Sequence, residues 1–182
     1  MDRRKSLELI AGFSPFLLLS SNPPASKNFD SSEWLKNFKV RWNNSRTYCF
    51  EIFDAIPLSD FNFKPNPHIM PFGKLFTHIG SGLNVYAGVL DGSVSDDEPE
   101  PSNKTEVSTY VVNAFAHFNN ALDKINVDDL YAIRHTKSEV EPWKEFSMFD
   151  IITLGYNHTI HHIAQATVYI RLKNIVPPKF RF

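Results

Sequence analysis

Four stretches of this sequence carry large apolar side chains at the spacing of one face of an α-helix. The segment 105–124 shows the clearest stripe, and similar stripes occupy 30–55, 71–90 and the region from 147 to 173. No segment alternates apolar and polar residues as a half-buried strand does. We therefore expect an all-α fold in the form of a four-helix bundle.

Capping and helix-breaking residues set the limits of these helices. Asp30, followed three residues later by Glu33, resembles a capping box at the start of the first helix. Either Ser147 or Asp150 can start the fourth helix, and the pair Pro177-Pro178 prevents its continuation. Between 125 and 147 the helical pattern breaks up, so we expect a long irregular crossover between the third and fourth helices that covers one end of the bundle.

The composition fits one folded domain over 30–182. The chain has 182 residues, 42% of them hydrophobic, and a formal net charge of -1. A nucleic-acid-binding protein would need a basic face, so we expect no nucleic-acid partner. The single cysteine, Cys49, excludes an intramolecular disulfide and is expected to be a buried, unreactive thiol.

The segment 1–27 is expected to be an export signal and linker. It has a basic start with Arg3 and Arg4, a mostly apolar run over 9–19 and a turn-rich stretch over 22–26, which is the order of a signal peptide. The paired arginines indicate a degenerate twin-arginine signal and an exported, periplasmic protein. The apolar run is too short for a stable membrane span. The alternatives are a helix that packs on the bundle or a frayed tail, with the protein in the cytoplasm.

Two histidines near the C-terminus, His158 and His162, lie four residues apart in the fourth helical stretch. Residues at this spacing are neighbours on a helix surface, so both imidazoles can face one metal ion. A zincin protease would carry a glutamate directly after the first histidine, where this chain has Thr159. The other interpretation is a pair of hydrogen-bonded interior histidines.

The sequence around these histidines resembles a known family. Gln165 follows His162 by about one turn, and a Tyr-Ile-Arg-Leu stretch leads to Pro177-Pro178. A second stretch, Pro71-Phe72-Gly73-Lys74-Leu75-Phe76-Thr77-His78, is similar to the family's entry into its second helix. Together these segments resemble the DinB-like (YfiT-like) metalloprotein superfamily over roughly 31–182. The resemblance implies a four-helix bundle of the DinB-like type.

The resemblance also implies a metal site made by His78, His158 and His162. Three histidine ligands leave a position open for water or substrate. They suit zinc, nickel, iron and copper alike, and of these we expect zinc or nickel. Gln165 lies within about 20° of His158 around the helix, so it is expected to orient a ligand histidine without binding the metal itself. His161 is expected to pack or to hydrogen-bond without binding the metal.

The function that follows is that of a divalent-metal-dependent enzyme acting on a small molecule. Characterised relatives include thiol transferases, so the resemblance implies a transferase or a hydrolase. Export would count against dependence on a cytoplasmic thiol pool and would favour a hydrolase. The alternative is a non-catalytic metal-binding or stress-response bundle. Similar bundles often pair through helices, which leaves a homodimer open.

Overall fold

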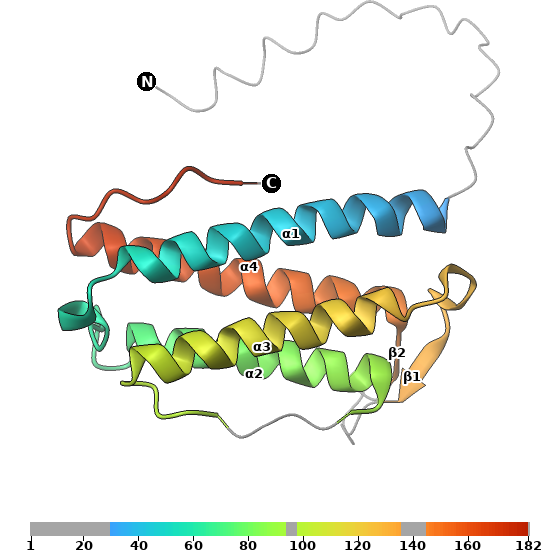
Figure 1. The fold of residues 1–182 in the computed structure, drawn as a ribbon, viewed down its shortest axis with the longest axis horizontal. Helices are drawn as coiled ribbons and strands as arrows, with labels where there is room; N and C mark the ends of the chain where they lie inside the picture. The colour runs from blue at the N-terminus through green and yellow to red at the C-terminus, as the bar shows by residue number, and fades with distance from the viewer. Residues whose placement is uncertain (1–29, 94–97, 136–144, 182) are drawn as a thin grey trace, which may run out of the picture.

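The computed structural model describes residues 30–93, 98–135 and 145–181. Four α-helices make up most of this part of the chain (Figure 1). They are α1 (Ser31–Ala55), α2 (Phe72–Asp91), α3 (Lys104–Asp123) and α4 (Met148–Leu172). The shorter elements are two 3-10 turns, η2 (Leu58–Asp60) and η3 (Val127–Asp129), and two strands, β1 (Ile133–His135) and β2 (Glu145–Ser147).

The expected export signal over 1–27 lies outside the described residues. Within them, no helix combines the length and the apolar character needed to cross a membrane.

Side-chain caps start three of the four helices. The carboxylate of Asp30 accepts hydrogen bonds from two backbone N–H groups in the first turn of α1. Asn103 caps α3 by accepting from the backbone N–H of Glu106. At α4, the Ser147 side chain accepts from the backbone N–H of Asp150, whose carboxylate accepts from the backbone N–H of Ser147. These caps satisfy N–H groups that have no partner within the helix, and the bond between Ser147 and Asp150 decides where α4 begins.

The helices form two parallel pairs. Along α1 and α4, Trp34 contacts Phe149 and, one turn later in α1 and two turns later in α4, Phe38 contacts Tyr156, with ring centroids 4.6 and 5.8 Å apart. Their residue numbers rise together, so α1 and α4 run in the same direction. In Figure 1, α2 and α3 also run side by side, opposite in direction to α1 and α4. The pair that matters for the site is α2 and α4, which are antiparallel.

This topology requires the connection between α2 and α3 to return along the length of the bundle. Its described part, 98–103, lies beside the start of α2, where Lys74 pairs with Glu98. The connection between α3 and α4 instead covers one end of the bundle, as expected from its irregular sequence (Figure 1). It contains an antiparallel ribbon in which Ile133 pairs with Ser147. Strands of three residues are too short for alternation to be detected in the sequence.

Aromatic side chains fill the interior between the helices. Trp42 on α1 packs against Phe115 and Phe118 of α3 and donates a hydrogen bond from its indole N–H to Asn119, with a distance of 2.6 Å. Cys49 is fully buried, and burial raises the pKa of its thiol, as expected for an unreactive cysteine. The largest fully buried aromatic side chains are Trp42, Phe53, Phe61, Phe72, Phe76, Phe115 and Phe118.

Candidate metal centre

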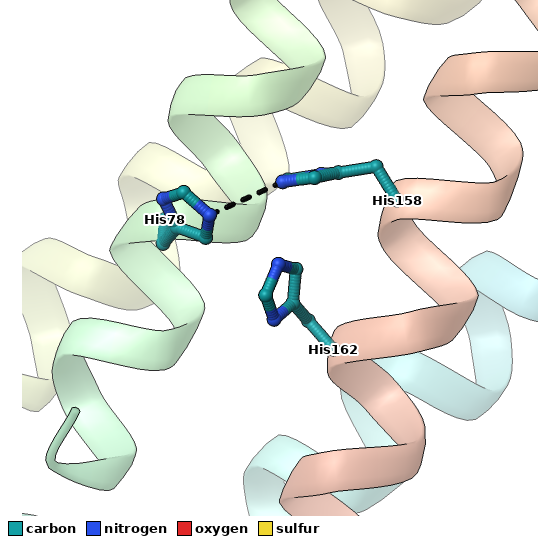
Figure 2. Close-up of side chains that lie close together, drawn as sticks. All are labelled: His78, His158 and His162. Carbon is teal, nitrogen blue, oxygen red and sulfur yellow. Dashed lines mark hydrogen bonds between the residues drawn. The ribbon is translucent and has the colours of Figure 1, made fainter. Parts of the chain in front are cut away.

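The structure brings His78, His158 and His162 together. His78 comes from α2, and the other two rings come from adjacent turns of α4 and reach across to it (Figure 2). The Nε2 atoms of His78 and His158 are 3.2 Å apart. Each residue offers one ring nitrogen, and these three nitrogens lie within 4.8 Å of one another. Among the histidine, cysteine, aspartate and glutamate side chains of the described residues, these three histidines form the group whose spacing suits a metal ion.

Gly82 of α2 makes room for His158. Gly82, four residues after His78, lies against the imidazole of His158, and a Cβ atom there would be 2.6 Å from Nδ1 of that ring. Tyr86, a further turn along α2, has its ring 5.9 Å from the same imidazole. Gly80 has a different role, since a Cβ atom there would be 2.7 Å from the ring of Tyr110 on α3. One glycine therefore serves the histidine cluster and the other serves helix packing.

Gln165 holds the ring of His162. Nδ1 of His162 donates a hydrogen bond to the side-chain oxygen of Gln165 at 2.9 Å, and the amide nitrogen of Gln165 donates to Nε2 of His161 at 3.0 Å. With its proton on Nδ1, His162 turns the lone pair of Nε2 toward the cluster. The sequence placed Gln165 closest in angle to His158. Two helical turns separate those residues along the axis, whereas His162 is one turn away and within reach.

The environment keeps the imidazoles of His158 and His162 uncharged. Burial, followed by the neighbouring rings of His162, His78 and His161, lowers the pKa of His158 to about 4. Burial also lowers the pKa of His162, although its hydrogen bond to Gln165 acts in the opposite direction. Both rings are therefore neutral at pH 7, which is the form that binds metal ions.

The donor set fits a divalent metal ion. Two nitrogens bound at 2.0–2.1 Å to one tetrahedral ion lie about 3.3 Å apart, close to the 3.2 Å between Nε2 of His78 and Nε2 of His158. Nδ1 of His158 is buried and has no hydrogen-bond partner among the described residues. Among the described residues, the hydrogen-bond partner of His158 is therefore on its Nε2 side. An ion between the two Nε2 atoms would replace the hydrogen bond that joins them in its absence.

His161 and His117 lie outside this cluster. His161 contacts the ring of His162, with centroids 4.9 Å apart, and it bonds to Gln165. His117 on α3 bonds through Nδ1 to Asn84 and through Nε2 to Ser93, so it links α3 to the end of α2. Neither residue adds a ring nitrogen to the group of three.

Comparison with known proteins agrees with the bundle and with the sequence motifs. The sequence model of the DinB superfamily matches residues 41–166, which is more than half of the chain. Among curated proteins, none matches in sequence.

Three solved structures share the fold. A DinB-like protein from Bacillus cereus is 17% identical with a TM-score of 0.68, covering 79% of this chain and 95% of its own. The DinB-like protein YjoA from Bacillus subtilis is 16% identical with a TM-score of 0.62, covering 80% and 98%. A conserved protein from Enterococcus faecalis is 18% identical with a TM-score of 0.54, covering 78% and 94%. With its matching sequence and its four-helix fold, the chain belongs to the DinB superfamily.

Proposed function

We propose that His78, His158 and His162 bind one divalent transition-metal ion, zinc or nickel, and that this centre serves an enzyme acting on a small molecule. The observation that carries the proposal is the convergence of three imidazoles, with two Nε2 atoms 3.2 Å apart. Imidazole nitrogen suits zinc and nickel alike.

Three protein ligands leave at least one coordination position for water or substrate. His162 is buried, but His78 and His158 are partly exposed, so the cluster is not sealed from solvent. A bound ion would lower the pKa of a coordinated water or thiol and so supply a nucleophile near neutral pH. The chain's part is to hold three ring nitrogens in place, through the space left by Gly82 and the hydrogen bond from His162 to Gln165.

The reaction class supported best is transfer to, or hydrolysis of, a small electrophilic molecule. Both reactions need an ion with an open position and a nucleophile made from water or a thiol. A non-catalytic metal-binding bundle would use the same three ligands but would have no exchangeable water on the ion. Water relaxation measurements on the manganese- or nickel-loaded protein distinguish the two.

Metal analysis tests the proposal directly. Purified protein is incubated with zinc or nickel, desalted and analysed for bound metal, beside the variants His78→Ala, His158→Ala and His162→Ala. We expect one equivalent in the wild type and none in each variant, while the helical circular-dichroism signal is retained.

His161→Ala is the matched control, because His161 neighbours His162 in the sequence and in space but lies outside the group of three. It should keep one equivalent. A wild type that binds neither metal, or a His162→Ala variant with unchanged metal content, would overturn the proposed centre.

A further inference from the structure

A carboxylate lies beside the α2 side of the cluster. Lys74, His78 and Ser81 are spaced by four and three residues, so they share one stripe of α2. Glu98, from the segment that returns between α2 and α3, forms an ion pair with Lys74. The same carboxylate accepts a hydrogen bond from the Ser81 side chain. Contacts one turn before and one turn after His78 therefore hold Glu98 over the turn that carries this imidazole.

Glu98 is an anion at neutral pH, and its charge acts on His78. Partial burial would raise the pKa of Glu98, but the hydrogen bonds from Lys74 and Ser81, with the electrostatic influence of Lys74 and His78, lower it below its usual value. The side chain of Glu98 is about one-third exposed, since its relative accessibility is 34%. Solvent therefore screens this interaction only in part.

The outer nitrogen of His78 is the atom that faces away from the cluster. Nε2 of His78 points at His158, and the second ring nitrogen lies on the opposite side of the ring (Figure 2). His162 has an acceptor for its outer nitrogen in Gln165. No hydrogen bond to Nδ1 of His78 is formed within the described part of the chain. A ligand histidine usually donates this N–H to a carboxylate, a carbonyl or a water.

We propose that Glu98 is the carboxylate partner of His78, a positioning residue that accepts the Nδ1–H hydrogen bond when an ion is held at Nε2. This inference rests on the proposed function, because it takes His78 as a metal ligand. Glu98 would hold His78 on α2 as Gln165 holds His162 on α4. Glu98 places a negative charge next to the three histidine ligands, which increases the affinity of the site for a cation. Lys74 and Ser81 keep the carboxylate in place.

The experiment compares two glutamates of the same segment. Glu100, two residues from Glu98, accepts hydrogen bonds from Ser102 and forms no hydrogen bond or ion pair with α2 among those described. Dissociation constants for Co²⁺ are measured from the visible absorption of the wild type, Glu98→Ala, Glu98→Gln, Glu100→Ala and Glu100→Gln. Thermal melts of the metal-free proteins show whether each variant folds. Histidine ¹⁵N spectra of the Zn²⁺-loaded proteins report the proton on Nδ1 of His78.

We expect Glu98→Ala to weaken Co²⁺ binding about 10- to 100-fold, Glu98→Gln to lie between Glu98→Ala and the wild type, and both Glu100 variants to stay within about twofold of the wild type. The Nδ1–H signal of His78 should be protected from exchange in the wild type and lost in Glu98→Ala. An unchanged affinity in Glu98→Ala, or an equal loss in the Glu100 variants, would overturn the role of Glu98. A wild type that binds no Co²⁺ would overturn the proposed function itself.

Discussion

Gly82 lies directly against the imidazole of His158. A Cβ atom at position 82 would be 2.6 Å from Nδ1 and 3.1 Å from Nε2 of that ring, so no larger side chain fits while the ring keeps its place. Glycine inside a helix is less favourable than alanine by about 1 kcal/mol. Gly82 weakens α2, and the space that the His158 ring of α4 needs explains why glycine stands at this position.

Gly82→Ala should reduce metal affinity at least tenfold. The new methyl group must push the His158 ring out of the cluster, which removes one of three ligands. Helical content should be unchanged, because alanine favours the helix. Competition titration with a zinc indicator, together with far-ultraviolet circular dichroism, measures both effects.

Gly80→Ala is the matched control. Its Cβ atom would be 2.7 Å from the Tyr110 ring on α3, away from the histidine cluster. This variant should melt at a lower temperature and keep its metal affinity within about twofold. If the two glycine variants lost affinity equally, the specific link between Gly82 and His158 would be wrong.

Gln165 should tune the site without being essential to it. Gln165→Leu removes the acceptor for Nδ1–H of His162, and loss of such a partner weakens metal binding about 10- to 100-fold. Gln165→Glu keeps an acceptor and adds a negative charge, so its affinity should equal or exceed that of the wild type. Zinc titrations of both variants test this. An unchanged affinity in Gln165→Leu would contradict the assigned role.

The helices could be predicted because their signals are local. The Asp30 cap, the Ser147 cap and the apolar stripes depend on residues within one or two turns, and the structure places α1 and α4 directly after the two capping residues. The four-helix fold and the superfamily were also predicted, and the matching of residues 41–166 confirms the superfamily.

The unpredicted features depend on contacts between distant segments. The ribbon of β1 and β2 joins two three-residue strands, and neither strand is long enough to show alternation. The angular position of Gln165 on a helical wheel predicted a contact with His158. The distance along the helix axis instead places Gln165 within hydrogen-bond reach of His162. Glu98 lies 20 positions from His78 in the sequence, and the pairing with Lys74 becomes visible only once the returning segment is placed.

The metal-free protein should lose stability as the pH falls. The pKa of His158 is lowered from 6.5 to about 4 in the fold, chiefly by burial. Below pH 6.5 the unfolded chain takes up a proton that the folded chain does not, so protonation favours unfolding. This contribution to stability is fully present above pH 6.5 and is lost as the pH falls toward 4.

Urea unfolding of chelator-treated protein between pH 7.5 and 4 measures this effect. The midpoint for the wild type should decrease with pH more steeply than that for His158→Gln, which has no imidazole at this position. Equal slopes for the two proteins would show that His158 does not carry the pH dependence.

The N-terminal segment makes a prediction of a different kind, since 1–27 lies outside the described residues. We propose that the protein is exported and that the mature chain lacks roughly the first 25 residues, because signal peptides of about 15–30 residues are removed. Intact mass and N-terminal sequencing of protein recovered from the cell envelope measure the cleavage. Replacing both Arg3 and Arg4 with lysine should leave a full-length precursor inside the cell if the twin-arginine route is used. An intact N-terminus on protein from the envelope would contradict cleavage, and export of the double variant at the wild-type level would contradict the twin-arginine route.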